Sequence, residues 1–360
     1  MIEIDNVYLN PAVFKCVFKA LKSFKDGKIG NVRSLFENEF RKMIGSKYCF
    51  ACHNGTSGLH ISLLALNLKE KDEVITNPLT HISTISAILK CKARPVFTRI
   101  NEQGFMDLED LREKINPYTK VIIPVHLNGF PENIEDILKF KDKYKDLYVV
   151  EDACQALGGK VKINGGFRNL GTISDIGIFS FGVFKLLTTL EGGMIVTDDD
   201  RIAERISRLL DNGDYRNRND IILGYSLRLD YIRSTIGLAN LENLKEQISA
   251  RKDKWSFYKK ALQKFRWLKI VNPHSSVRIN YFQFIIYIDS KEKCKKVVKS
   301  LCKILTSSAG FPNEYIKLLP SSHDILKRHQ WLGEHYILLP THSSLKDEDM
   351  KKIVECFENA

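Results

Sequence analysis

Short apolar stretches alternate with helical patterns between residues 48 and 197. The helical patterns, for example 57–68 and 132–145, have apolar residues at spacings of three and four. The apolar stretches read YCFACH at 48–53, DEVITN at 72–77, ARPVFTRI at 93–100, KVIIPVHL at 120–127, LYVVEDA at 147–153, IGIFSF at 176–181 and GMIVTD at 193–198. This alternation predicts an α/β fold in which a largely parallel, doubly wound sheet has helices on both faces.

The pattern changes in the last third of the chain. A helix is expected at 200–211, and the stretch 230–265, rich in Leu, Lys and Glu, is expected to be one long helix that bridges two domains. Further elements follow, namely strands at 281–288 and 335–342 and helices at 291–304 and 346–358. We therefore expect a large domain over residues 1–250 and a small C-terminal α+β domain over 251–360.

Composition is that of a globular protein. The chain has 360 residues, of which 44% are hydrophobic, enough for a large core and a smaller one. No stretch approaches the roughly 18 to 20 apolar residues of a membrane span, and the beginning, MIEIDNVYLN, lacks the basic and apolar regions of a signal peptide. We expect a cytoplasmic protein that has no membrane partner.

Cysteines and charge add little to this interpretation. The eight cysteines are scattered, so reduced thiols are expected, and the C-x-x-C of Cys49 and Cys52 lies in an apolar run with no second pair, which favours a buried strand over a metal site. The net charge of +12 is spread widely. Its densest clusters are a helix-like face at 291–299 and a mixed-sign stretch at 214–220. We expect no nucleic-acid partner, and a basic surface is equally suited to steer a diphosphate-bearing substrate.

A phosphate site is suggested where strand 48–53 runs into the next helix. The sequence HNGTSGLH places Gly55 in a turn, so the backbone N–H groups of Thr56 and Ser57 are expected to point outward at a helix start. Gly-Thr-Ser is also common helix-capping chemistry, so both interpretations stay open. The segment fits neither the G-x-G-x-x-G nor the Walker A pattern.

Two further residues have settings that suggest chemistry. Asp152 ends the apolar strand LYVVE, where it either caps the following segment or keeps the ring nitrogen of a bound heterocycle protonated. Lys185 lies in an apolar loop beside Phe184 and Leu186, where desolvation makes its amine a usable nucleophile toward an aldehyde, although a surface lysine is the commoner case. Ser180 precedes it and has a hydroxyl that suits a phosphate, and Gly192–Gly193 allows close backbone approach.

These residues, and the segments around them, occur in an order that resembles the DegT/DnrJ/EryC1/StrS family of sugar aminotransferases. Members of that family are fold type I enzymes that use pyridoxal 5′-phosphate (PLP). The resemblance covers most of the chain and is loose only over 268–334. The segments that carry it are GTS at 55–57, EVITNPLTHISTISAI at 73–88, KVIIPVHLNGFPENIEDI at 120–137, VVEDACQALG at 149–158, SFGVFK at 180–185, TLEGG at 189–193, LGYSLRLD at 223–230 and LLPTHSSLKDEDMKKI at 338–353.

The resemblance implies a role for each matching position. Lys185 matches the lysine that forms the Schiff base and moves the proton, Asp152 the partner of the pyridine nitrogen, and Gln155 a residue packed near the cofactor ring. The phosphate contacts match Thr56, Ser57 and Ser180. Two cofactor-binding positions depart from the family: His81 replaces a stacking aromatic residue, and Ser226 replaces an asparagine that reaches the cofactor of the neighbouring subunit.

The implied reaction moves an amino group from glutamate or glutamine to a keto group on a nucleotide-linked sugar, with pyridoxamine phosphate as the intermediate form of the cofactor. A homodimer with a shared active site is expected, and no metal. The alternatives are an aminotransferase for another keto compound such as a cyclitol, a non-catalytic homologue that binds nucleotide sugar or PLP, and a deoxygenating sugar dehydratase. Lys185 argues against the dehydratase, in which a histidine replaces the lysine.

Overall fold

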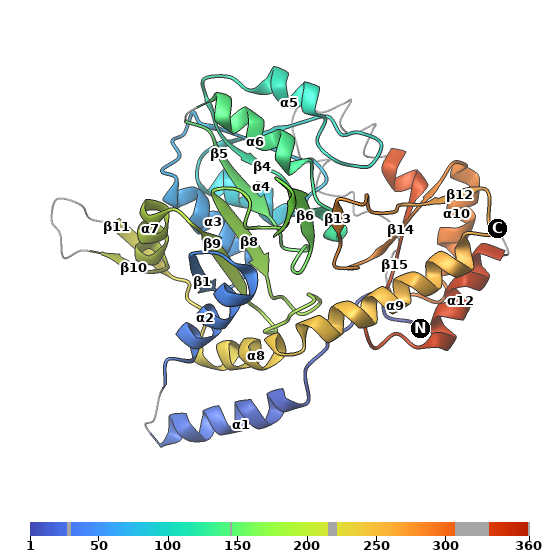
Figure 1. Cartoon of the computed structure of the whole chain (residues 1–360), viewed down its shortest axis with the longest axis horizontal. Coiled ribbons are helices and arrows are strands. Elements are labelled where there is room, and N and C mark those ends of the chain that lie inside the picture. The colour runs from blue at the N-terminus through green and yellow to red at the C-terminus, as the bar shows by residue number, and fades with distance from the viewer. Residues whose placement is uncertain (27–29, 145, 215–221, 307–330, 359–360) are drawn as a thin grey trace.

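The central feature of the molecule is a seven-stranded sheet (Figure 1). The computed structural model describes residues 1–26, 30–144, 146–214, 222–306 and 331–358. The strand order is β1-β9-β8-β5-β4-β2-β3. The strands are β1 (Tyr48–Cys52), β2 (Glu73–Thr76), β3 (Arg94–Phe97), β4 (Thr119–Ile123), β5 (Tyr148–Asp152), β8 (Ile176–Ser180) and β9 (Gly193–Thr197). Each of the seven apolar stretches predicted between residues 48 and 198 forms one of these strands.

The sheet is mostly parallel, as predicted. Strands β3, β2, β4, β5 and β8 run parallel to one another. The exception is β9, which pairs antiparallel with both β8 and β1. The carboxyl ends of the parallel strands therefore meet at one edge, where ligands of open α/β sheets bind.

Helices cover both faces of this sheet, which makes the fold doubly wound. On β4, Ile122 packs into one core cluster and Val121 and Ile123 into the other, because successive side chains of a strand point to opposite faces. The cluster around Val121 includes α3 (Gly55–Ala65), α4 (Ile82–Lys90) and α7 (Asp200–Leu210). The cluster around Ile122 includes α2 (Val32–Ile44), α5 (Leu108–Lys114) and α6 (Ile134–Lys143).

A second sheet, which is antiparallel, lies in the C-terminal part of the chain and has the strand order β12-β14-β15. Tyr258, Phe284 and Phe357 are fully buried in the core beneath it. Its elements are β12 (Leu268–Ile270), β14 (Phe284–Ile288), α10 (Lys291–Leu301), β15 (Tyr336–Leu339) and α12 (Asp347–Glu358). The division at residue 250 stays a prediction, and that residue lies inside a helix whose first residue, Leu244, packs in the core of the large sheet.

The prediction of one long helix over 230–265 is wrong, because two helices occupy this stretch. These are α8 (Tyr231–Leu241) and α9 (Leu244–Leu262), and α9 runs from the large sheet to the small one (Figure 1). Just before the break, the buried side chain of Asn240 donates to the carbonyl of Thr188 and accepts from the backbone N–H of Asn10. This local anchoring fixes the end of α8 against the large domain.

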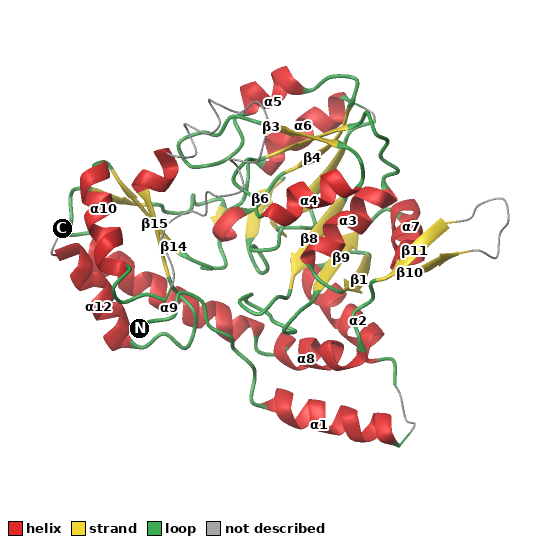
Figure 2. Ribbon diagram, turned by 180° about the vertical axis from the view of Figure 1, so that it is seen from behind, coloured by secondary structure: helices red, strands yellow, loops and turns green. Residues whose placement is uncertain are grey.

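Several elements lie outside the predicted pattern. The first helix, α1 (Ala12–Lys25), lies apart from the body beside α8 (Figure 2). Before it, Ile2 bridges to Leu305, so the N-terminal segment contacts the small sheet. The remaining elements are η1 (Leu127–Gly129), the hairpin β6 (Lys160–Ile163) and β7 (Gly166–Asn169), which pairs with β13 (Val277–Arg278), and the hairpin β10 (Asp211–Asp214) and β11 (Ile222–Ser226).

Two expectations from the sequence concern residues that are only partly inside the described ranges. Residues 215–220 of the mixed-sign stretch and residues 307–330 of the loosely resembling region lie outside them. Cys49 and Cys52 are described, and both lie buried in β1 with free thiols, where burial raises their pKa values. Within the described ranges, no helix is both long and apolar enough to cross a bilayer.

Candidate active site

Asp152 is the last residue of β5 and is only 5% exposed. The hydroxyl of Thr84 donates to its Oδ2 at 2.8 Å, and the backbone N–H of Cys154 donates to its Oδ1 at 3.2 Å. A buried carboxylate needs such donors to offset the loss of water. The sheet thus holds an anion at its ligand-binding edge.

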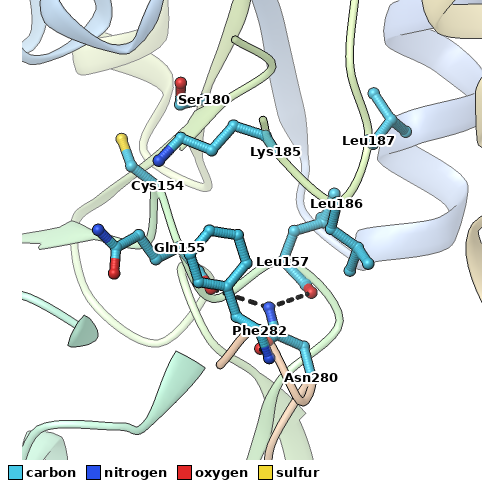
Figure 3. Close-up of a pocket in the computed structure, with 9 residues that line it drawn as sticks. All are labelled: Cys154, Gln155, Leu157, Ser180, Lys185, Leu186, Leu187, Asn280 and Phe282. Carbon is cyan, nitrogen blue, oxygen red and sulfur yellow. Dashed lines mark hydrogen bonds between the residues drawn. The ribbon is translucent and has the colours of Figure 1, made fainter. Parts of the chain in front are cut away.

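Lys185 lies in the loop between β8 and β9, in a turn closed by its own N–H donating to the carbonyl of Gly182. Its side chain reaches across a small cavity (Figure 3). The Nζ atom is 5.6 Å from the centre of the Phe282 ring. The cavity is lined by Cys154, Gln155, Leu157, Ser180, Lys185, Leu186, Leu187, Asn280 and Phe282.

The Gly-Thr-Ser segment begins α3, as expected, and packs against the lysine pocket. A Cβ atom at Gly55 would lie 3.0 Å from Sγ of Cys154 and 3.1 Å from Cβ of Ser180. The expectation that the N–H of Ser57 points outward is wrong, because it donates to Oδ1 of Asn54, the N-cap residue, at 2.8 Å. Capping therefore uses one of the two N–H groups, and the N–H of Thr56 and the hydroxyl of Ser57 remain as phosphate donors in this turn.

His81 is the N-cap residue of α4 and connects to the same turn through Ser83. Thr56 donates to the Ser83 hydroxyl at 2.7 Å, and that hydroxyl lies 2.7 Å from Nδ1 of His81. Partial burial and the positive charge of Lys185 lower the pKa of His81 from 6.5, while the charge of Asp152 opposes this. His81 is therefore close enough to Lys185 and Asp152 for both charges to act on it.

Gln155 lines the cavity, but its amide oxygen is already occupied. Oε1 accepts from the backbone N–H of Asn128 at 2.7 Å, and the backbone carbonyl of Gln155 accepts from Nδ2 of Asn280 at 2.8 Å. These bonds fix the side chain, and a ligand near Gln155 would meet its Nε2 donor.

Ser226 does not join the other predicted residues. It lies exposed at the end of β11, the second strand of a hairpin that projects from the body (Figure 2), and it is not among the residues that line the lysine pocket. The structure gathers the remaining predicted residues at the ligand-binding edge of the sheet, namely Thr56, Ser57, His81, Asp152, Gln155, Ser180 and Lys185.

Sequence reasoning missed residues that reach the pocket from the small domain. Phe282 and Asn280 belong to a loop before β14, and Arg251 of α9 places its Cζ 5.4 Å from the centre of the same Phe282 ring that Lys185 approaches. The charges of Arg251 and Lys185 act on Asp5 of the N-terminal segment, where burial raises the carboxyl pKa and these charges oppose the rise. No local motif marks these residues, because their contacts depend on how the two domains pack.

A buried hydrogen-bond network of His126 and Glu151 lies next to Asp152. Nε2 of His126 donates to Oε2 of Glu151 at 2.9 Å, and both side chains are fully buried. Burial alone would raise the pKa of Glu151, but hydrogen bonds from His126 and from backbone N–H groups lower it below its ordinary value. The backbone N–H of His126 donates to the carbonyl of Asp152, so this network holds the strand end that carries the anion.

Known proteins resemble the chain over nearly its whole length. The model of the DegT/DnrJ/EryC1/StrS aminotransferase family matches residues 12–358. The GDP-perosamine synthase of Escherichia coli O157:H7 is 33% identical over 91% of this chain and 89% of its own. The crystal structure of the sugar aminotransferase CalS13 from Micromonospora echinospora superposes with a TM-score of 0.85 at 26% identity, covering 100% of both chains. The PLP form of Spr1654 from Streptococcus pneumoniae has a TM-score of 0.87 at 22% identity over 99% and 98% of the two chains, which shows the shared fold.

The fold and site define a PLP-dependent aminotransferase of the α/β class, with a lysine facing a pocket beside a buried carboxylate. The chain belongs to the DegT/DnrJ/EryC1/StrS aminotransferase family. Its residues fit the cofactor of that family. An amine suits the aldehyde of PLP, and the Asp152 carboxylate suits a protonated ring nitrogen. Thr56 and Ser180 flank Gly55, where a Cβ would be tightly packed against Cys154 and Ser180.

Proposed function

We propose that the protein transfers an amino group from glutamate or glutamine to a keto group of a nucleotide-linked keto-deoxy sugar, giving an amino sugar for surface polysaccharide or glycoside biosynthesis. The observation that carries the proposal is the Lys185 amine in a pocket at the end of β5, with the buried Asp152 beside it. The choice of a nucleotide-linked sugar is supported by the name of a relative, GDP-perosamine synthase.

Each residue of the site has a part in this proposal. When bound, PLP supplies an electron sink for the carbanion of the amino donor. Nζ of Lys185 would take the proton from the α-carbon of the donor as a base and then give it up as an acid. Asp152 holds the proton on the ring nitrogen. The N–H of Thr56 and the hydroxyls of Ser57 and Ser180 would bind the phosphate, and Gln155 and His81 would pack near the ring.

The proposal includes a homodimer. Ser226 is exposed on a hairpin that projects from its own subunit, so we assign it to the active site of a second copy of the chain. Exposed aromatic side chains on α1 support such a contact, because Phe14 and Phe18 are 70% and 73% exposed on one face of that helix. Sedimentation analysis tests this part, and a monomer at working concentration would contradict it.

The proposed reaction is tested by absorption spectroscopy of the purified protein with PLP, before and after L-glutamate. Wild type is expected to show a visible band of lysine-linked cofactor that glutamate bleaches, and Lys185→Ala is expected to lack it. Lys162→Ala, which removes an exposed lysine on β6, serves as the matched control and should behave as wild type. A wild-type protein without a lysine-dependent band would leave only a non-catalytic binding role.

The acceptor is identified in a second step. Loaded enzyme and glutamate are incubated with a panel of nucleotide-linked keto sugars and with a keto cyclitol, and mass spectrometry detects the amine formed. Amination of a nucleotide-linked sugar supports the proposal. Amination of the cyclitol alone would overturn the substrate class and leave the reaction type intact.

A further inference from the structure

A directed chain of hydrogen bonds runs from the start of α3 to the start of α4. Thr56 Oγ1 donates to Ser83 Oγ at 2.7 Å. The proton of the Ser83 hydroxyl is then free to point to Nδ1 of His81, 2.7 Å away. The backbone N–H of Ser83 donates to the same Nδ1 at 3.2 Å. Nδ1 of His81 therefore faces two donors.

This arrangement specifies one form of the imidazole. A nitrogen that accepts hydrogen bonds carries no proton of its own, so the proton of the neutral ring lies on Nε2. Adding a proton to Nδ1 would break the bond from the Ser83 N–H and would force the Ser83 hydroxyl to turn from donor to acceptor. The positive charge of Lys185 also opposes a charged ring at this place, while Asp152 favours it.

We propose that Ser83 is a positioning residue, which fixes His81 as a neutral imidazole with Nε2–H as its donor. His81 then meets cofactor or substrate as a hydrogen-bond donor and a stacking surface, and never as a base at Nδ1. The proton transfers of the reaction are left to Lys185. This inference rests on the proposed function for its role in turnover, but the state of the ring is a property of the protein alone.

The chain contains the same local motif elsewhere, which provides a matched control. Nδ1 of His274 lies 2.8 Å from the Ser276 hydroxyl and accepts from the Ser276 N–H at 3.3 Å. That pair is exposed and lies outside the lysine pocket. What distinguishes His81 is the additional donor, Thr56, behind its serine, and the charges of Lys185 and Asp152 around its ring.

The test is nuclear magnetic resonance of histidine-¹⁵N-labelled protein without cofactor, with His81→Phe to assign the signal. Wild type is expected to show the Nε2–H form at neutral pH and a His81 pKa below 6.5. Ser83→Ala should raise that pKa, because it removes a donor that favours the unprotonated Nδ1. Ser83→Thr retains the hydroxyl and should restore the wild-type values, whereas Ser276→Ala should leave His81 unchanged.

The pH profile of turnover gives a second readout. In Ser83→Ala, the acid limb of kcat/KM is expected to move to higher pH by the same amount as the His81 pKa, and His81→Phe should remove that limb. A ring protonated on Nδ1, or a His81 pKa that Ser83→Ala leaves in place, would overturn the inference. Failure of the cofactor band in wild type would contradict the proposed function instead, and the resonance experiment would still decide the state of His81.

Discussion

The Thr84 hydroxyl donates a 2.8 Å hydrogen bond to Oδ2 of Asp152, which connects a covering helix to the end of a central strand. Thr84 is fully buried and lies within 2.7 Å of the hydroxyl of Thr80, one turn earlier in the chain. The carboxylate is therefore oriented by α4, the helix that His81 caps. The N-terminal part of α4 thus positions both the Asp152 carboxylate and the His81 imidazole.

Thr84→Val removes this donor while keeping the shape of the side chain. The buried Oδ2 loses a partner, so the free energy of unfolding is expected to fall by about 1 to 3 kcal/mol. Urea denaturation of the protein without cofactor measures it. Thr80→Val retains the bond to Asp152 and is expected to cost less. An equal loss in both variants would show that the carboxylate does not depend on Thr84.

The sequence is sufficient to select Lys185 and Asp152 as candidates, because each stands in a local pattern, and their roles stay predictions. Asp152 ends an apolar strand, and Lys185 lies in an apolar loop between two strands. Asn280 and Phe282 have no such signal, because they reach the pocket only through the fold. Asn280, for example, contacts Gln155, which lies 125 residues earlier in the chain. The break between α8 and α9 could not be predicted from the local sequence either, because it accompanies a contact of Asn240 with Asn10, which is distant in the chain.

Glu132 gives the fold a pH dependence that can be measured. Its carboxyl is only 2% exposed, and burial raises its pKa from 4.5 to about 7, although hydrogen bonds from Asn77 and Met106 oppose the rise. The folded state then binds a proton more tightly than the unfolded state. The contribution of Glu132 to stability is therefore greatest below pH 4.5. It falls as the pH rises from 4.5 to about 7 and stays constant above that pH.

Glu132→Gln is expected to remove this contribution. Between pH 4.5 and 7, the wild-type free energy of unfolding should fall by up to about 3 kcal/mol more than that of the variant. Urea denaturation at several pH values measures the difference. Glu135→Gln, which changes an exposed carboxylate three residues on, should follow the wild-type curve. Parallel curves for wild type and Glu132→Gln would contradict the raised pKa.

Asn280 joins the small domain to the loop that carries Gln155. Its Nδ2 donates to the carbonyls of Gln155 and Leu157 at 2.8 and 3.0 Å, and its Oδ1 accepts from the N–H of Phe282 at 3.1 Å. Asn280→Ala should lower the free energy of unfolding by about 2 to 4 kcal/mol, because buried backbone groups lose their partners.

The same substitution also releases Phe282 from its place against Lys185. Affinity for PLP is therefore expected to fall, as measured by absorbance titration. Asn272→Ala is the control, because that exposed side chain makes one bond to the carbonyl of Ile270 and should change stability by less than about 0.5 kcal/mol. If both variants have wild-type stability, Asn280 does not hold the domains together.

Gly193 begins β9 directly opposite Cys52 and passes close to the turn that carries Thr56. A Cβ atom here would lie 2.7 Å from the carbonyl carbon of Asn54 and 2.9 Å from the nitrogen of Gly55. Both contacts are with backbone atoms, which do not move aside as a flexible side chain does. Gly193→Ala must therefore displace either the strand or the start of α3.

The expected cost of Gly193→Ala is about 1 to 3 kcal/mol of unfolding free energy, as for other substitutions that overpack a core. Because the displaced turn carries the proposed phosphate contacts, affinity for PLP should fall together with stability. Gly166→Ala is the matched control, since a Cβ there meets nothing within 4 Å. A Gly193→Ala protein that loses stability but binds PLP as tightly as the control would show that β9 moves and the turn does not. Loss of both would show that the turn is fixed by its contact with this strand.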